Sequence, residues 1–171
     1  MLSCLVGSEM CIRDRAINSA REHHTLSVEL GARSYPILIS SGCIEKLTEK
    51  KIDLQKDGRK IVALVDENLI SSNPSLLEPF LSDIPFLKVP SGENSKSSKW
   101  LCEGWDFLAS NKVDRTGMLF VIGGGVTGDL GGFLAASYLR GIEFIQVPTT
   151  LLAMVDLSLI HISEPTRQDS I

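Results

Sequence analysis

A run of glycines directly after an apolar segment is the feature that most restricts how this chain folds. Residues 117–129 read GMLFVIGGGVTGD. The apolar run 118–122 is short and nearly continuous, which is typical of a strand buried on both faces. Small and apolar residues at helical spacing follow over 128–139. Because glycines let the backbone approach a ligand closely and adopt positive φ, we expect a tight turn between a buried strand and a helix.

This turn has the pattern of a diphosphate site. Gly123, Gly125 and Gly128 fit the dinucleotide fingerprint G-x-G-x-x-G in a strand–turn–helix context. A helix start offers unpaired N–H groups and a positive dipole end to an anion. The acidic residue usual about 20 positions later is not convincing, because Glu143 stands at the start of the next expected strand. The residues alone leave two alternatives open: nucleotide binding, or merely a tight strand–helix turn.

Apolar runs alternate with helical segments along the rest of the chain. We expect strands at 26–30, 37–39, 60–65, 85–89, 118–122 and 142–147, and helices at 43–51, 95–111 and 128–139. Such alternation predicts an α/β fold, a Rossmann-like and mostly parallel sheet with flanking helices.

Composition excludes several classes of partner. The chain of 171 residues carries 17 Lys plus Arg and 21 Asp plus Glu, a net charge of −4 without a basic cluster, so nucleic acid is not an expected partner. No apolar stretch approaches the ~18–20 residues of a membrane helix, so no membrane partner is expected either. The four cysteines form no CxxC pair or zinc-type spacing. We expect a cytoplasmic setting.

The two ends differ in character from the rest of the chain. Residues 1–15 read MLSCLVGSEMCIRDR and lack helical or strand periodicity, and the tail reads SLIHISEPTRQDSI. Both resemble peptides that arise when sequencing-adapter DNA is translated. We therefore expect 1–15 and 159–171 to be artefacts outside the fold, and 16–158 to be a nucleotide-binding domain.

Two further loops carry groups suited to a ligand, each with a structural alternative. In PSGENSKS (90–97), Glu93 could accept hydrogen bonds from ribose hydroxyls and Lys96 could supply a cation, or Ser95 could simply cap the following helix. In VPTTLL (147–152), Thr149 and Thr150 could face a ligand beyond the end of a strand, but capping of the next helix is the default expectation.

These segments, in this order, resemble the 3-dehydroquinate synthase family. The resemblance is carried by LSVELGARSYPILI, PSGENSKS and the long block GGGVTGDLGGFLAASYLRGIEFIQVPTTLLAMVD, and covers 26–158. It implies a homodimeric lyase that uses NAD and a divalent metal, zinc or cobalt. The implied reaction converts the small-molecule sugar phosphate 3-deoxy-arabino-heptulosonate 7-phosphate to 3-dehydroquinate plus phosphate, in the shikimate route to chorismate and aromatic amino acids.

The resemblance also implies roles for individual residues. Asp156 matches an active-site carboxylate, and Arg140 matches an arginine that holds substrate phosphate across a dimer interface, a task that suits a bidentate guanidinium. The residues that match cofactor contacts are Asp66, Asn68, Glu93, Lys96, Gly124, Gly125, Asp129, Thr149, Thr150 and Leu152.

The departures from the family pattern matter as much as the matches. Where the family has a substrate-binding lysine, this chain has Ile162. The family's metal ligands, one Glu and two His, belong to a C-terminal helical domain that is missing here, so we assign no metal ligand in this chain and expect it to be inactive alone. Two alternatives stay open: another sugar-phosphate cyclase, of the deoxy-inosose or valiolone type, or a non-catalytic NAD-binding module.

Overall fold

A seven-stranded sheet with the order β2-β3-β1-β7-β6-β4-β5 forms the centre of the computed structural model, which describes residues 2–5, 24–29, 34–39 and 43–155. All neighbouring strands are parallel except β2 and β3, which form an antiparallel pair. The strands are β1 (Leu2–Leu5), β2 (His24–Val28), β3 (Tyr35–Ile39), β4 (Ile61–Asp66), β5 (Phe86–Val89), β6 (Met118–Gly123) and β7 (Glu143–Pro148). The predicted α/β class with a mostly parallel sheet is confirmed.

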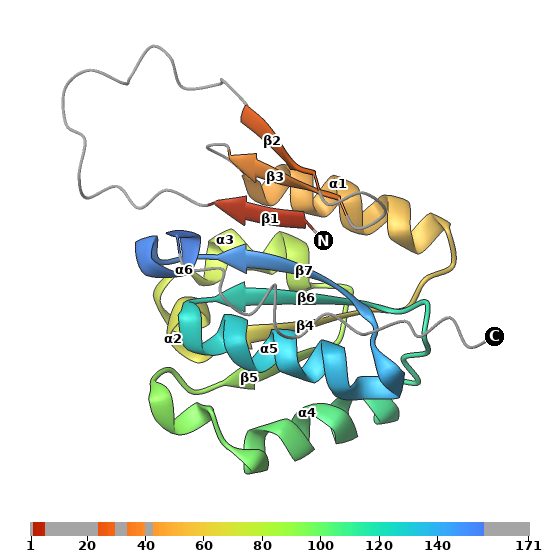
Figure 1. Cartoon of the computed structure of the whole chain (residues 1–171), viewed down its shortest axis with the longest axis vertical. Helices are drawn as coiled ribbons and strands as arrows, with labels where there is room; N and C mark the ends of the chain where they lie inside the picture. The colour runs from red at the N-terminus through yellow and green to blue at the C-terminus, as the bar shows by residue number, and fades with distance from the viewer. Residues whose placement is uncertain (1, 6–23, 30–33, 40–42, 156–171) are drawn as a thin grey trace.

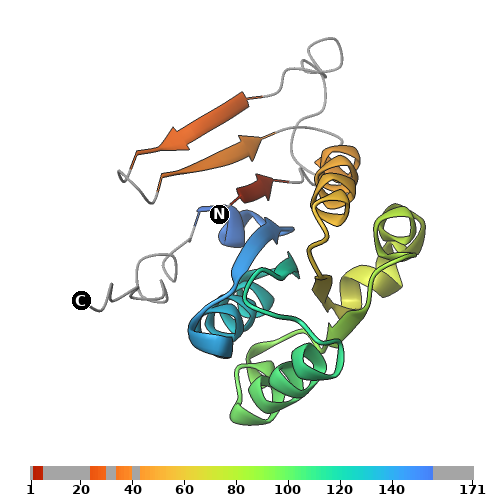
Figure 2. The same cartoon turned by 90° about the vertical axis from the view of Figure 1, so that its right-hand side faces the viewer.

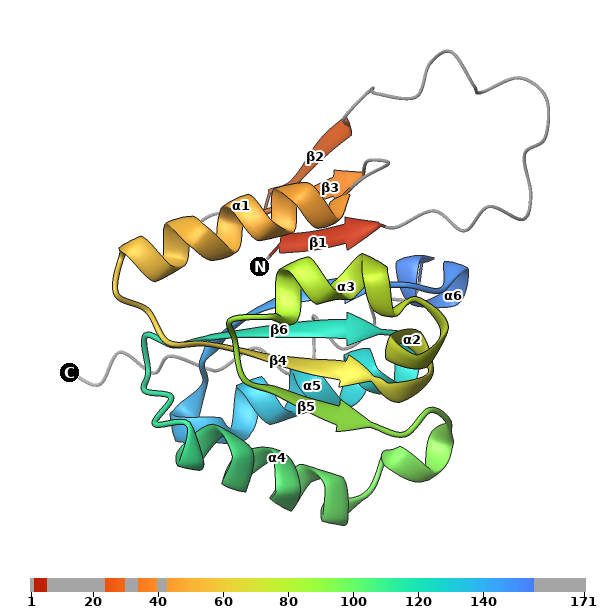
Figure 3. The same ribbon diagram turned by 180° about the vertical axis from the view of Figure 1, so that it is seen from behind.

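Helices cover both faces of this sheet. Figure 1 shows α4 and α5 in front of the strands, Figure 3 shows α1 and α3 on the opposite face, and Figure 2 shows the layers from the side. The helices are α1 (Cys43–Lys56), α2 (Glu67–Ser72), α3 (Pro74–Leu81), α4 (Ser98–Ser110), α5 (Gly125–Ser137) and α6 (Leu151–Val155), with short 3-10 turns η2 (Glu93–Ser95) and η3 (Tyr138–Arg140). Among the described helices, none is long and apolar enough to cross a membrane.

The core consists of two apolar clusters, one on each face of the sheet. In β6, Phe120 and Ile122 pack with the α1 and α3 side chains, whereas Leu119 and Val121 pack with those of α4 and α5. Every residue of β6 is buried. Alternate side chains point to opposite faces of a strand, so a strand covered on both faces must be apolar throughout. This explains the continuous apolar run that precedes the glycines.

One short strand lies inside a segment that was expected to stay outside the fold. Leu2–Leu5 form β1, which pairs in parallel with β3 and with β7. The expectation that 1–15 contributes nothing to the fold is therefore wrong for residues 2–5. The backbone of any short apolar segment can pair with a free strand edge, because the ladder hydrogen bonds use main-chain groups. Whether the segment is an artefact stays a prediction.

The chain between β4 and β5 forms two helices where the sequence indicated only a break at Asn73-Pro74. α2 ends at Ser72 and α3 begins at Pro74, where proline is favoured because the first helical N–H needs no partner. Hydrophobic periodicity does not identify α2 because that helix is too short, and it does not identify α3 because a proline, Pro79, lies inside it.

A buried lysine joins α1 to the segment after α3. Lys51 is 2% exposed, and its Nζ donates to the carbonyl of Phe80 at 2.9 Å and to the carboxylate of Asp83. The hydrogen bond from Lys51 is the main cause that lowers the pKa of Asp83. Removing one partner of such a pair leaves a buried charge without its counterion.

We expect Asp83→Asn to lower the free energy of unfolding by about 1–2 kcal/mol at neutral pH, because Asp83 itself is half exposed. Since the folded-state pKa is lowered, this contribution is present above the ordinary carboxyl pKa of about 4 and is lost as pH falls below it. Urea unfolding at pH 7 and pH 3 checks this: the difference between the two proteins should shrink at pH 3. An equal difference at both values would contradict it.

Candidate functional site

The glycine turn places the start of α5 at the carboxyl end of β6. Gly123 ends the strand, Gly124 is the N-cap, and α5 begins at Gly125, earlier than the sequence predicted. Gly124 has φ −77° and ψ −171°, and none of these turn glycines has positive φ. The access of glycine to positive φ is therefore not used in this turn.

Space, rather than backbone freedom, explains these glycines. A Cβ at Gly123 would lie 2.7 Å from the Cβ of Thr127, and one at Gly128 would lie 2.6 Å from the amide nitrogen of Gln146. Gly125 differs, because a Cβ there would meet nothing within 4 Å in the part of the chain that the structure describes. Gly123 and Gly128 allow α5 to pack closely on the sheet. Gly125 instead faces space that no described residue fills.

The first turn of α5 presents backbone donors to that space. The first N–H groups of a helix have no intrahelical acceptor. The N-cap Gly124 supplies no side-chain capping bond, no described side chain accepts from these N–H groups, and no acidic residue stands in the first turn. The N–H of Gly128 is the first to be used, donating to the carbonyl of Gly124 at 2.9 Å. Open N–H groups, the helix dipole and a glycine surface together suit a diphosphate.

Asp66 lies beside this turn, at the end of the neighbouring strand β4. Its Oδ1 accepts from the backbone N–H of Asn68 at 2.9 Å and from the hydroxyl of Ser91, and its Oδ2 accepts from the hydroxyl of Thr127 at 3.4 Å. Asp66 thus caps α2 and also connects β4 to the first turn of α5. A carboxylate at the end of the strand next to the glycine turn is where a dinucleotide fold binds the adenosine ribose.

The position of Asp66 bears on the acidic residue that the sequence search did not find. The fingerprint places an acidic residue after the glycines in sequence, whereas Asp66 precedes them and lies beside them because β4 pairs with β6. Glu143, correctly set aside, lies at the opposite end of the sheet and pairs with Arg59 at 2.8 Å.

Lys96 joins the loop after β5 to α5. Its Nζ lies 2.7 Å from Oδ2 of Asp129 and 3.3 Å from Oε2 of Glu93. The hydrogen bond to Asp129 is the main cause that raises the pKa of Lys96, with a smaller contribution from Glu93. The sequence offered Glu93 and Lys96 as ligand groups, and the structure places them in an ion-pair cluster with Asp129. Lys96 stays charged across the physiological pH range.

Ser95 does not cap α4. It is 1% exposed, and its hydroxyl donates to the carbonyl of Pro90 at 2.5 Å. The N-cap is Ser97, which makes no side-chain capping bond. Ser95 therefore stabilises the loop that carries Glu93 and Lys96.

The segment after β7 closes the other side of the glycine turn. The N–H of Thr149 donates to the carbonyl of Gly123 at 2.9 Å, and the side chain of Thr150 lies against Gly124, 3.3 Å from the position of a Cβ there. The hydroxyl of Thr150 accepts from the N–H of Ala153 at 3.3 Å, so the expected capping of the next helix is confirmed. Leu152 is 69% exposed on α6.

Arg140 lies away from this group of residues. It follows α5, whose 13 residues span about 20 Å at 1.5 Å per residue, so it stands near the amino ends of the strands. Leu139, Arg140 and Gly141 have φ values of 49°, 68° and 109°, a rare run of left-handed residues. The exposed Arg140 cannot reach the glycine turn of its own chain.

The predicted active-site carboxylate Asp156 lies outside the described residues, and so does Ile162, which stands where the family has a lysine. The predicted cofactor contacts gather at the carboxyl ends of β4, β5, β6 and β7. Sequence reasoning missed Ser91 and Thr127, the two hydroxyls on Asp66. Thr127 stands inside the fingerprint, but at a position where the motif accepts any residue.

Donors for a metal are not gathered in the described part of the chain, where no group of three or more His, Cys, Asp or Glu could hold one. These residues do not fit a metal ion.

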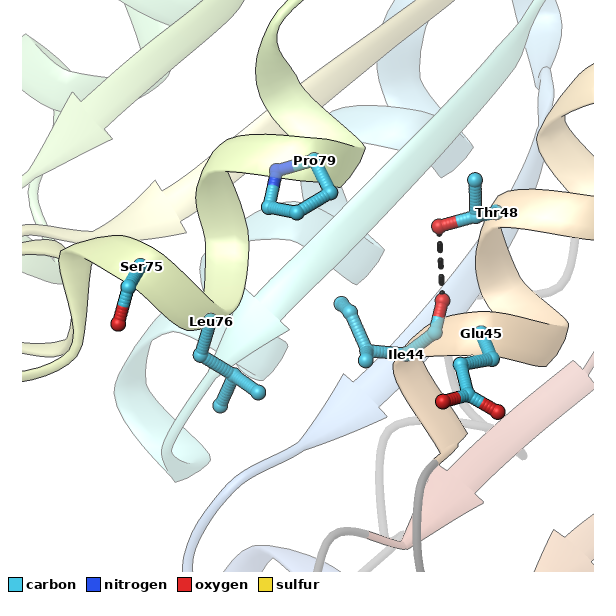
Figure 4. Close-up of a pocket in the computed structure, with 6 residues that line it drawn as sticks. All are labelled: Ile44, Glu45, Thr48, Ser75, Leu76 and Pro79. Carbon is cyan, nitrogen blue, oxygen red and sulfur yellow. Dashed lines mark hydrogen bonds between the residues drawn. The ribbon is translucent and has the colours of Figure 1, made fainter.

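A separate hollow between α1 and α3 has a volume of about 420 Å³. Its lining residues are Ile44, Glu45, Thr48, Ser75, Leu76 and Pro79 (Figure 4). This lining is mostly apolar, and its one charged group is a carboxylate. It therefore does not suit a diphosphate, and the carboxyl edge of the sheet remains the candidate site.

Comparison with known proteins finds one family whose members resemble much of this chain. Residues 86–160 match a family model described as 3-dehydroquinate synthase N-terminal. The chain is 47% identical over 136 residues to the 3-dehydroquinate synthase of Opitutus terrae, covering 80% of this chain and 38% of that protein. Over these residues the chain is similar to the 3-dehydroquinate synthases. It spans about two fifths of the length of the curated relatives that it matches first.

Solved structures of sugar-phosphate cyclases share the fold. A 2-deoxy-scyllo-inosose synthase superposes with a TM-score of 0.66 at 25% identity, over 80% of this chain and 39% of that one. A 2-epi-5-epi-valiolone synthase from Streptomyces hygroscopicus, solved with NAD+ and Zn2+ bound, gives a TM-score of 0.51 at 26% identity, over 58% of this chain and 30% of that one. The family model and the curated relatives confirm the predicted resemblance to the 3-dehydroquinate synthases, a lyase family.

Proposed function

We propose that this chain is the NAD-binding part of a 3-dehydroquinate synthase. The observation that carries the proposal is the open N-terminus of α5 behind Gly124 and Gly125, with Asp66 beside it on the neighbouring strand. In this proposal the first N–H groups of α5 bind the diphosphate of NAD, and Asp66 binds the adenosine ribose. Residues 16–158 would then form the NAD-binding domain.

The chain's own residues would bind and orient NAD rather than complete the reaction. Lys96 holds the loop after β5 against α5 through Asp129, which fixes one wall of the site. Thr149 and Thr150 fix the opposite wall against the glycines. When bound, NAD supplies transient oxidation of a substrate hydroxyl. Because the described residues do not fit a metal, no metal-dependent step is assigned to them.

For the whole protein we propose conversion of 3-deoxy-arabino-heptulosonate 7-phosphate to 3-dehydroquinate plus phosphate, in the cytoplasm. Arg140 supports a homodimer in this proposal, since an exposed guanidinium that is remote from its own glycine turn can bind substrate phosphate at a neighbouring copy's site. The alternatives of a deoxy-inosose or valiolone cyclase carry the same NAD site and predict a different sugar-phosphate substrate.

The test of the activity uses the source locus. The two adapter-like ends meet the rest of the chain near codons 15–25 and 158–162. We expect resequencing of the gene across these two points to give a longer reading frame, which continues from Asp156 and supplies one Glu and two His for the metal. The restored protein should release phosphate from 3-deoxy-arabino-heptulosonate 7-phosphate only when NAD and a divalent metal are present, whereas the 171-residue chain should not turn over. A metal-dependent steady-state rate from the 171-residue chain would contradict the expectation that this chain is inactive alone. Phosphate release only from the substrate of another cyclase would favour that cyclase.

A further inference from the structure

The carboxylate of Asp66 receives more hydrogen bonds than its capping role requires. The cap of α2 needs only the contact from the N–H of Asn68 to Oδ1. Two hydroxyls from other parts of the fold also donate to the carboxylate. Ser91 comes from the loop after β5, and Thr127 comes from the first turn of α5. Neither hydroxyl contributes to capping, so their placement calls for a separate explanation.

Thr127 is in an unusual position for a hydroxyl group. Its side chain is completely buried, at 0% exposure, and packs so closely on Gly123 that a Cβ there would lie 2.7 Å away. Its hydroxyl reaches Oδ2 of Asp66 at 3.4 Å, across the boundary between β6 and β4. Burying a hydroxyl has a free-energy cost unless it finds an acceptor, so this contact ties the rotamer of Asp66 to the helix that forms the diphosphate site.

The number of hydrogen bonds that Asp66 can still accept indicates which group it can bind. An ionised carboxylate has about four lone-pair positions. Among the residues that the structure describes, two donate to Oδ1 and one donates to Oδ2, which leaves acceptor capacity on Oδ2 at the edge that carries the glycine turn. A ribose 2′-hydroxyl can donate to this oxygen. A 2′-phosphate cannot donate there when ionised, and its charge is repelled by the carboxylate.

We propose that Ser91 and Thr127 are positioning residues that orient the Asp66 carboxylate toward the adenosine ribose and so favour NAD over NADP. The proposal rests on the proposed function, because it requires NAD at this site. It goes beyond that function by assigning the cofactor preference to two hydroxyls that do not themselves need to touch the cofactor.

The experiment measures nucleotide affinity of the 171-residue chain by calorimetry, with NAD, NADP and ADP-ribose as probes. Ser91→Ala and Thr127→Val remove the two donors, and Thr127→Ser keeps the hydroxyl. Thr116→Val is the matched control, because its hydroxyl donates to Asp114 at 2.7 Å in the loop before β6, at the opposite end of that strand from the glycine turn. Melting temperatures are recorded for every variant.

We expect Ser91→Ala and Thr127→Val each to weaken NAD and ADP-ribose by about 10-fold, the order expected for one hydrogen bond to a charged group, and to change NADP by less than about 2-fold. The ratio of NAD to NADP affinity should therefore fall, and Thr127→Ser and Thr116→Val should keep it. Unchanged NAD affinity in both donor variants, or an equal loss of NAD and NADP, would overturn the inference. If Thr127→Val fails to fold, the exposed Ser91 still decides the outcome. If the unmodified chain binds neither nucleotide, the proposed function fails, and this inference fails with it.

Discussion

Gly125→Ala is expected to lower the affinity of the chain for NAD by about 100-fold without lowering its stability. A methyl group at this position has no neighbour within 4 Å in the described part of the chain, so it would project into the space where the diphosphate is proposed to bind. Loss of two hydrogen bonds to a charged group, at about 1.5 kcal/mol each, corresponds to roughly that factor. Alanine is also the better helix former, so the free energy of unfolding should stay unchanged or rise slightly.

Titration with NAD and urea unfolding of the same preparation check both parts of this prediction. If Gly125→Ala binds NAD as tightly as the unmodified chain, the diphosphate does not approach this glycine. If it loses affinity and stability together, the loss reports damage to the fold and gives no support to the site.

Gly131→Ala, the same substitution on the same helix, is expected to do the reverse. A Cβ at Gly131 would lie 2.5 Å from both methyl groups of Val121, which is 1% exposed in the middle of β6. Val121 is β-branched and surrounded by core, so neither it nor the strand can move away without disturbing the packing of α5. We expect the free energy of unfolding to fall by about 2–4 kcal/mol, at or just beyond the upper end of overpacking effects.

The midpoint of urea unfolding at constant m-value measures this loss, and Gly125→Ala serves as the matched control. Under conditions in which Gly131→Ala remains folded, its affinity for NAD should stay within a few-fold of the unmodified chain, because Gly131 lies a full turn and a half beyond the glycine turn. A stability within 0.5 kcal/mol of the unmodified chain would contradict the close approach of α5 to β6.

Gly125 and Gly131 illustrate what could and what could not be predicted from the sequence. The strand–turn–helix order was readable because an apolar run buried on both faces, a glycine run and helical spacing are each local patterns. The purpose of each glycine was not readable. Gly123 and Gly128 make room for Thr127 and Gln146, and only the three-dimensional packing identifies those neighbours.

The carboxylate beside the glycine turn shows a second limit. A search forward from the fingerprint finds Glu143, at the wrong end of the sheet. Asp66 is 57 residues before Gly123 in the chain and is adjacent only because β4 pairs with β6. Strand order is a non-local property and is not visible in a local pattern. Asp66 was therefore predicted only from the family resemblance, and its position beside the glycine turn is known only from the structure. The strand β1 and the helices α2 and α3 were missed because each is too short or too irregular for periodicity to identify.

Backbone amide shifts of the chain on addition of NAD test the central claim most directly. We predict that the largest changes fall at Gly124–Thr127, at Asp66 and in the loop that carries Glu93 and Lys96. Residues around the hollow between α1 and α3 should be unaffected. Changes confined to that hollow, or none at the start of α5 when NAD is saturating, would contradict the account.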